Sequence, residues 1–188
     1  MTDMLAQEEK WKLSKNKKGI KVYTLKVNSS KLNDSRATTL VNSTIDKVLE
    51  KLNDVLNHYR WMDKIGRSNI LERVSDHEFY AYYVAKSPWP VLDRDIIAHY
   101  KIEEQSPGTV LLSIVGAPNF IPKKRNKVRI KDLVSSWLIS DEGEGQVSIV
   151  YQHHADPGGN VPEWLVNTAA EENPYNTLLG LIKQLKKK

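Results

Sequence analysis

Apolar and polar residues alternate along much of the chain, in short runs separated by turn-forming residues. In the first run, residues 19–27, apolar or aromatic side chains are interleaved with Lys or Thr. This two-residue period is typical of a strand with one buried face. Such runs recur down to residue 155, and they predict strands over 19–27, 36–41, 70–74, 78–85, 93–102, 109–115, 128–139 and 146–155.

Two segments in the first third of the chain show helical spacing instead. Residues 2–11 have the pattern of a short amphipathic helix. A second helix is predicted after Ser43-Thr44, because a hydroxyl at this position can cap the first turn. Its apolar residues at helical spacing are Ile45, Val48, Leu49, Leu52, Val55 and Leu56.

A third, long helix is predicted from Pro162 to about Lys186. It follows the pair Gly158-Gly159, which can take the positive φ angles that a sharp reversal requires. Pro162 pre-sets φ for the first turn, where an amide proton would have no helical partner. Pro174 removes one hydrogen bond inside this helix and is expected to kink it.

The order of these elements indicates the fold class. Many strands follow one another, with helices at the two ends of the chain, which predicts an α+β fold with an antiparallel sheet and excludes a doubly wound parallel sheet. The chain has 188 residues and no long low-complexity stretch, so we expect one domain over residues 1–188.

The long final helix presents two unequal stripes of side chains. Its bulky stripe consists of Leu178, Ile182 and Leu185. The adjoining stripe is mostly small or polar and consists of Val166, Ala170, Asn173, Thr177 and Leu181. A helix of this kind laid across a curved sheet closes a core at one end and roofs a cavity elsewhere. The alternative is that Tyr83, Tyr100 and Tyr151 of the sheet fill this space.

Composition excludes several classes of protein. Cysteine is absent, so neither a disulfide framework nor a thiolate zinc site is possible. The net charge of +5 comes with basic clusters at 10–21, 123–131 and 186–188, but no zinc finger, RNP-type motif or recognition helix accompanies them. We therefore expect no nucleic-acid partner. No stretch approaches the ~18 apolar residues of a membrane span or resembles a secretory signal, and we expect a cytoplasmic, monomeric protein without metal or cofactor.

Four segments carry a resemblance to a known family. They are Trp11 with residues 19–23, residues 86–95, Val128-Arg129, and residues 156–167. In this order and at these spacings they are similar to the landmarks of START domains, the steroidogenic-acute-regulatory-related lipid-transfer family. The resemblance spans nearly the whole chain. It implies the helix-grip fold, in which a curved antiparallel sheet wraps around a long C-terminal helix and encloses an apolar cavity for one lipid molecule.

Strand alternation combined with this resemblance gives candidate ligand-binding residues. They are Ala81, Tyr83, Ile96, Ala98, Tyr100, Leu111, Ser113, Trp137, Tyr151, His153, Val166, Ala170, Thr177 and Leu181. A shift of one residue would turn any strand over. For the strand at 109–115, local hydrophobicity favours Leu112 and Ile114 over Leu111 and Ser113 as the inward pair.

The resemblance also implies a gate formed by the loop at residues 116–127 together with the last helix. This loop places Phe120 and Ile121 beside the cations Lys123, Lys124, Arg125 and Lys127. Such a combination suits transient contact with an anionic membrane surface. The alternative is an ordinary solvated loop.

The chain departs from the sterol-binding members of the family at two positions. Where these members place a buried arginine and acid, this sequence has Tyr100 and a residue near Ala81. The ligand's polar group is then expected to meet Tyr100, Tyr83 or His153. Arg94 and Asp95 resemble a pair of the family at a strand start, where we expect them to anchor loops.

Two other functions remain open at this stage. The wider helix-grip group includes polyketide aromatases and cyclases, and a cavity-facing His153 can in principle act as acid or base. However, no catalytic triad, HExxH motif or carboxylate pair is visible, and His153 and His154 point to opposite faces of one strand and cannot share a metal. A protein-interaction or ligand-sensing module is the second alternative, with residues 58–62 as a possible surface. We expect a noncatalytic protein that binds one hydrophobic lipid and transfers it between membranes.

Overall fold

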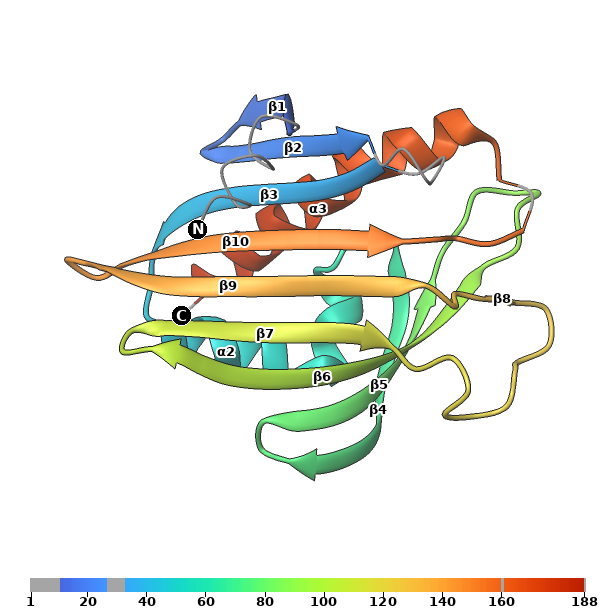
Figure 1. The fold of residues 1–188 in the computed structure, drawn as a ribbon, viewed down its shortest axis with the longest axis horizontal. Helices are drawn as coiled ribbons and strands as arrows, with labels where there is room; N and C mark the ends of the chain where they lie inside the picture. Colours follow the sequence, from blue (N-terminus) through green and yellow to red (C-terminus); the bar gives the residue numbers. More distant parts are fainter. Residues whose placement is uncertain (1–10, 27–32, 160, 188) are drawn as a thin grey trace.

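A computed structural model of the protein describes residues 11–26, 33–159 and 161–187. Within these ranges, ten strands form one sheet (Figure 1). The strands are β1 (Lys12–Lys17), β2 (Ile20–Lys26), β3 (Asn33–Asn42), β4 (Ile65–Ser75), β5 (Glu78–Ala85), β6 (Arg94–Ser106), β7 (Thr109–Gly116), β8 (Val128–Arg129), β9 (Leu133–Gly143) and β10 (Gln146–Ala155). The helices are α2 (Ile45–Asn53), the 3₁₀ helix η1 (Val55–Arg60) and α3 (Glu163–Leu185).

The sheet is antiparallel along its main path, which has the strand order β1-β2-β3-β10-β9-β7-β6-β5-β4. The short strand β8 lies off this path and pairs in parallel with β6. The ladder between β4 and β5 is interrupted by register shifts. Because such bulges bend and twist strands, they contribute to the curvature that Figure 1 shows at this edge of the sheet. The fold class predicted from the sequence is thus confirmed.

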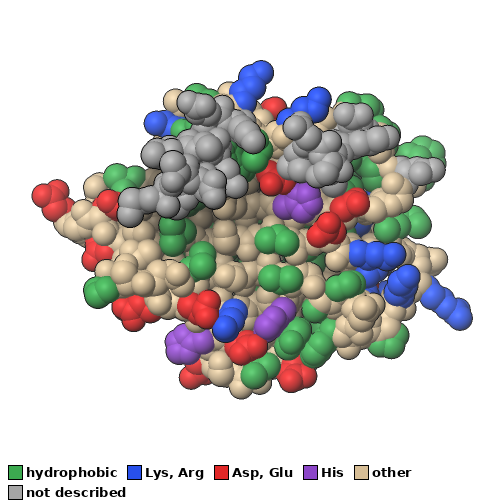
Figure 2. All heavy atoms as spheres, viewed as in Figure 1, with side chains coloured by type: hydrophobic (Ala, Val, Ile, Leu, Met, Phe, Trp, Pro, Cys, Tyr) green, Lys and Arg blue, Asp and Glu red, His purple; other side chains and the backbone are tan. Residues whose placement is uncertain are grey.

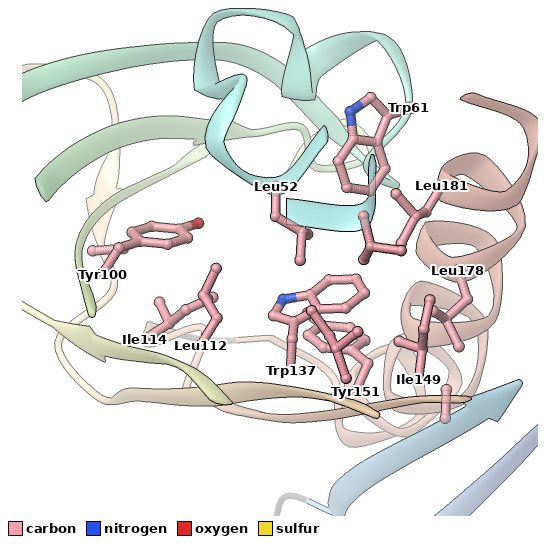
Figure 3. Close-up of a cluster of buried hydrophobic side chains, with 14 of the residues drawn as sticks. Leu52, Trp61, Tyr100, Leu112, Ile114, Trp137, Ile149, Tyr151, Leu178 and Leu181 are labelled. Atoms are coloured by element: carbon pink, nitrogen blue, oxygen red, sulfur yellow. The ribbon is translucent and has the colours of Figure 1, made fainter. Parts of the chain in front are cut away.

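Helix α3 lies across one face of the sheet, where it contacts β2, β3, β10 and α2. The second half of α3 buries Tyr175, Leu178 and Leu181 in the main hydrophobic core. Figure 3 shows side chains of the sheet, among them Trp137 and Ile149, directed toward Leu178 and Leu181. The bulky stripe of the helix therefore closes the core at the C-terminal end of α3, as its composition predicted.

Three local interactions explain the helix ends and one close approach. The Thr44 hydroxyl accepts a hydrogen bond from the Lys47 backbone N–H at 3.4 Å, which confirms a hydroxyl cap on α2. Gly158 and Gly159 take φ angles of 60° and 67° in the turn before α3. Within α3, an added Cβ at Gly180 would lie 2.1 Å from the carbonyl oxygen of Trp61, so only glycine allows this approach.

Most of the elements predicted from the sequence are present, with three differences. The segment 128–139 is not one strand, because Val128–Arg129 pairs with β6 whereas Leu133–Gly143 pairs with β7 and β10. Val55 and Leu56 belong to η1 instead of the preceding α-helix. Strand β1 was missed because its sequence, KLSKNK, is mostly polar. The helix predicted over 2–11 lies, apart from Trp11, outside the described residues.

None of the helices in the described ranges is both long and apolar enough to cross a bilayer.

Candidate functional site

Two adjoining cavities lie beneath the first half of α3. The outer cavity has a volume of about 230 Å³ and the inner cavity a volume of about 130 Å³, and both have mainly apolar walls. Both cavities are lined by Ala85, Ile130, His153, Ala155 and Asn173. These shared residues form a junction at which the two cavities adjoin, and we refer to the two adjoining cavities between sheet and helix together as the channel.

Most of the ligand-binding residues predicted from the sequence lie on the walls of this channel. The sheet contributes Tyr83, Ile96, Ala98 and Tyr100 to the inner cavity, Tyr151 beside them, and His153 at the junction. Helix α3 contributes Val166 and Ala170 to the outer cavity and Thr177 to the inner one. The small stripe of α3 therefore roofs the channel.

Three further predicted residues are buried but lie on neither cavity wall. Ala81, Trp137 and Leu181 belong to the main hydrophobic core. Trp137 stacks on Tyr151, its cross-strand neighbour, with ring centroids 4.1 Å apart, so it flanks this wall residue on the same face of the sheet. Leu181 packs at the closed end of α3, where the bulky stripe takes over (Figure 3).

The facing predicted for β7 was wrong. Leu112 and Ile114 are buried, and Ile114 lines the inner cavity, whereas Leu111 and Ser113 lie on the opposite face of the strand. Side chains of a strand alternate, so an error of one residue turns the whole strand over. Leu112 and Ile114 form the more hydrophobic pair, and burial of that pair decides the facing.

A chain of buried hydrogen bonds supports the inner cavity. The Tyr83 hydroxyl lies 2.7 Å from the Tyr100 hydroxyl and 2.9 Å from Nδ1 of His58. His58 Nε2 lies 3.2 Å from the Lys51 carbonyl oxygen, which can only accept. The proton of His58 is therefore on Nε2, Tyr83 donates to Nδ1, and Tyr100 donates to Tyr83. Burial lowers the pKa of His58 to about 4, so this ring is neutral at physiological pH.

His153 occupies the junction with one ring nitrogen already bonded. Its Nδ1 lies 2.7 Å from the hydroxyl oxygen of Ser135 on β9. Burial, and to a smaller extent the neighbouring His154, lowers the pKa of His153 to about 4. His154 points to the other face of β10 and pairs there with Asp34. The opposite facing of the two histidines, predicted from strand alternation, is thus present.

The channel is also lined by residues that were not predicted as ligand-binding, among them Ala85, Ile130, Ser135 and Asn173. Ser135, Ile130 and Ala85 line it from β9, the segment before β9 and the end of β5. Asn173 lines both cavities from α3. Of these four, only Asn173 had a signal in the sequence, since it belongs to the small stripe of the helix. The others depend on where strands end and change partner, which periodicity does not show.

The mouth of the outer cavity lies between the loop at 86–93 and the start of α3. Pro88 and Val91 line it from this loop, and Val161 and Leu165 line it from the other side. Arg94 holds the two sides together, since its guanidinium donates hydrogen bonds to the carbonyl oxygens of Leu92, Pro157 and Gly158. The anchoring role expected for Arg94 is thus seen in its contacts.

Large apolar side chains surround this mouth. Trp89 is 93% exposed, Trp164 is 69% exposed and Leu92 is 53% exposed. Each is next in sequence to a residue that lines the outer cavity, namely Pro88, Val91 or Leu165. We call Trp89, Leu92 and Trp164 the apolar rim.

The loop at 116–127, predicted as a gate, contributes no residue to the walls of either cavity. Phe120 stacks on Tyr80 with ring centroids 4.0 Å apart, and Ile121 packs against a separate apolar cluster on the outer face of the sheet. Arg129 holds the loop by donating to the carbonyl oxygens of Pro118, Ile121 and Pro122, and it also forms a buried ion pair with Asp95. Phe120 and Ile121 are therefore engaged with the protein itself.

The basic residues of this loop nevertheless face solvent. Lys123, Lys124 and Arg125 are exposed and Lys127 is half-buried. Figure 1 places the loop at the same end of the molecule as the 86–93 loop and the start of α3. Figure 2 shows Lys and Arg side chains gathered at this end. Cations and apolar rim thus share one end of the protein.

Comparisons with known proteins agree with this architecture. Residues 1–186 match the START domain family. An uncharacterized protein of Pseudomonas aeruginosa, PA1579, is 31% identical over 176 residues, covering 94% of this chain and 87% of that protein. The phosphatidylcholine transfer protein of Mus musculus is 25% identical over 178 residues, covering 92% of this chain and 82% of that protein.

A solved structure gives the same result in three dimensions. The STAR-related lipid transfer protein of Xanthomonas axonopodis superposes with a TM-score of 0.89 at 32% identity, covering 95% of this chain and 99% of that one. The family match extends over nearly the whole chain, and two of these relatives exceed 30% identity. The chain therefore belongs to the START domain family, whose members bind lipids in a helix-grip fold.

Proposed function

We propose that this protein binds one hydrophobic lipid molecule in the channel between α3 and the sheet and carries it between membranes. The observation that carries this proposal is the pair of adjoining, mainly apolar cavities roofed by the small stripe of α3. Membership of the START family and the similarity to phosphatidylcholine transfer proteins support it.

The driving force for such binding is the removal of apolar surface from water. A lipid that leaves a membrane exposes several hundred square ångströms, and at ~25 cal/mol per Å² its burial contributes roughly 5 to 10 kcal/mol before ordering costs. An apolar channel therefore binds lipid through shape and exclusion of water, and the binding energy does not depend on a charged partner in its walls.

The apolar rim provides a route for exchange with a bilayer. Trp side chains prefer the boundary between headgroups and acyl chains. The exposed cations of the 116–127 loop, at the same end, add about 1 kcal/mol each near an anionic surface. We propose that the rim inserts while these cations contact lipid headgroups, so that the mouth of the outer cavity faces the membrane. The 116–127 loop then contributes charge, and the 86–93 loop with α3 forms the opening.

The chemistry of His153 favours binding over catalysis. A general base works best when its pKa lies near the operating pH. Burial instead lowers the pKa of His153 to about 4, and its Nδ1 is bonded to a serine hydroxyl. This ring is suited to hydrogen bonding with a ligand. Because its pKa lies well below 7, the imidazole is a poor general base toward a ligand near neutral pH.

Filling the channel tests the proposal. Ala170 lines the outer cavity on α3, so Ala170→Phe is expected to occupy the space of the ligand. Thr168→Phe places the same side chain on the exposed face of the same helix and serves as the control. Both variants and the wild type are purified under nondenaturing conditions, and bound lipid is measured by native mass spectrometry.

Transfer is then measured between vesicles with a fluorescent phosphatidylcholine. We expect wild type and Thr168→Phe to retain lipid and to accelerate transfer, and Ala170→Phe to lose both activities. Equal lipid content in all three proteins would contradict binding in this channel. Binding without accelerated transfer would leave the channel intact and contradict the carrier role.

A further inference from the structure

The junction between the two cavities is polar on two opposite sides. Three of its five residues, Ala85, Ile130 and Ala155, are apolar. The other two are His153 on β10 and Asn173 on α3, so one polar group comes from the sheet and one from the helix. In a channel with mainly apolar walls, two such groups at the junction are a specific feature.

The orientation of the Asn173 amide is fixed by its neighbours. The backbone N–H of Asp63 donates to the Thr177 hydroxyl oxygen at 3.2 Å, and this hydroxyl donates in turn to Asn173 Oδ1 at 3.3 Å. The amide nitrogen therefore points away from Thr177. Within the described residues, Asn173 Nδ2 makes no hydrogen bond, and it remains a donor on the channel wall.

The sheet side offers two more groups without a protein partner. Ser135 occupies Nδ1 of His153, and within the described ranges Nε2 of this ring has no partner. If the Ser135 hydroxyl donates to Nδ1, the ring proton lies on Nε2 and Nε2 donates; if the hydroxyl accepts from Nδ1–H, Nε2 accepts. Tyr151 lies two residues before His153 on the same face, lines the inner cavity and is 3% exposed, and no described residue bonds its hydroxyl.

Buried polar groups without partners are costly, and proteins normally pair them. The hydroxyls of Tyr83 and Tyr100 illustrate this rule, since both are satisfied within the His58 chain. The groups on the channel wall without a described partner are the fixed amide donor of half-buried Asn173 and an imidazole nitrogen of half-buried His153 at the junction, with the hydroxyl of Tyr151 beside them in the inner cavity. Together they fit an oxygen atom that accepts from Asn173 and completes the bonding of His153 or Tyr151.

The charges along the channel indicate that this oxygen belongs to an uncharged group. Lys64, Lys86 and Arg94 line the outer cavity, whereas none of the described residues lining the inner cavity is Lys or Arg. Asp63 is among the residues that line the inner cavity. An anion on the inner side of the junction would share this space with an acidic residue and with no Lys or Arg in the described part of its wall, and burial of an unpaired charge is unfavourable.

We infer that the ligand is a lipid with an uncharged oxygen function, a hydroxyl or the carbonyl of an ester or amide, which Asn173 and His153 bind at the junction while apolar parts fill the cavities on either side. This inference rests on the proposed function and names the class of lipid. Any charged headgroup then lies toward the outer cavity and its cations.

The test compares three probes of equal chain length: dodecane, 1-dodecanol and dodecanoate. An apolar cavity without partners would bind dodecane far more tightly than 1-dodecanol, because the hydroxyl loses its hydrogen bonds to water. We expect wild-type protein to bind 1-dodecanol at least as tightly as dodecane, and dodecanoate more weakly than 1-dodecanol. Dissociation constants are measured by equilibrium dialysis at neutral pH.

Asn173→Leu keeps the branched shape and the number of heavy atoms of the side chain and removes the amide. In this variant we expect 1-dodecanol to bind about tenfold more weakly while dodecane binding is kept. His153→Phe, which keeps a ring and removes Nε2, is expected to act in the same direction. Thr168→Val, on the exposed face of α3, is the control and should leave all three constants unchanged.

The outcomes separate this inference from the proposed function. Wild-type protein that binds dodecane more than about tenfold more tightly than 1-dodecanol, or an Asn173→Leu variant that binds 1-dodecanol as the wild type does, would overturn the inference alone. Tightest binding of dodecanoate would also overturn it, in favour of an anion site. If the wild type bound none of the three probes, the proposed function would fail as well.

Discussion

The hydroxyl group of Tyr83 on β5 lies 2.9 Å from Nδ1 of His58 in η1, so a buried hydrogen bond joins the sheet to the helical segment beneath it. His58 lines neither cavity, and its second nitrogen bonds the Lys51 carbonyl at the end of α2. The imidazole therefore connects three elements. The imidazole must remain neutral to do so, because Nδ1 accepts a hydrogen bond from the Tyr83 hydroxyl.

This connection predicts a loss of stability on acidification. His58 has an ordinary pKa of 6.5, which burial lowers to about 4 in the folded protein. The unfolded chain thus binds more protons between these values, and stability is fully present above pH 6.5 and falls as the pH drops toward 4. Protonation of His58 is expected to remove about 3 kcal/mol of the unfolding free energy as the pH falls from 6.5 to 4. Urea unfolding at several pH values measures it.

Two variants isolate the effect of His58. His58→Asn removes the titrating group, so the unfolding free energy should depend less on pH between 6.5 and 4.5, although His153 retains part of the dependence. Tyr83→Phe breaks the same hydrogen bond and keeps the imidazole. We expect it to lower stability at pH 7 by about 1 kcal/mol without flattening the pH dependence. An unchanged pH profile in His58→Asn would contradict the assignment.

Periodicity was sufficient to predict most of the fold, because long antiparallel strands and a striped helix are encoded by neighbouring residues. The ends of β5 and β10 coincide with their predicted ends. Hydrophobic periodicity failed to predict strands whose position depends on pairing with other strands. β1 is an edge strand, and its mostly polar residues show no alternation of apolar and polar side chains. The break before Leu133 exists because Val128–Arg129 pairs with β6, whereas the strand that begins at Leu133 pairs with β7 and β10.

The channel was predictable in part for a similar reason. The small stripe of α3 predicted the roof of a cavity, and strand alternation correctly predicted that Tyr151 and His153 line the cavity wall. The position of the mouth of the outer cavity could not be predicted from the periodicity of the sequence. Phe120 and Ile121 are apolar residues in a basic loop, which is also the pattern expected for membrane contact. Only the three-dimensional arrangement shows that they pack on the sheet, while Trp89 and Trp164 are exposed.

The close contact between Gly180 and Trp61 gives a prediction about stability. Helix propensity alone predicts that Gly180→Ala stabilises α3 by about 1 kcal/mol. The new Cβ would, however, lie 2.1 Å from the Trp61 carbonyl oxygen, a backbone atom fixed by η1. We expect a net loss of about 1 to 3 kcal/mol and a lower Tm in calorimetry. A rise in Tm would show that the segment after η1 moves freely, and that the helix is not held at this point.

The apolar rim predicts how the protein meets a membrane. Replacing Trp89 and Trp164 with Ser removes two exposed aromatic side chains beside the mouth, and partition onto phosphatidylcholine vesicles should fall by at least about tenfold. Leu40→Ser is the control, because Leu40 is also exposed but lies on the outer face of β3. Vesicle sedimentation measures the partition.

The basic loop should act differently from the rim. Lys123→Glu combined with Lys124→Glu should weaken binding only to vesicles that also contain phosphatidylglycerol, and this loss should shrink as salt is raised, since salt screens exposed charges. Phe120→Asp should lower stability, because it breaks the stack with Tyr80, and should leave partition onto neutral vesicles close to that of the wild type. If Phe120→Asp abolished that partition while the two Trp replacements left it unchanged, the docking surface would be the 116–127 loop, and the rim would have another role.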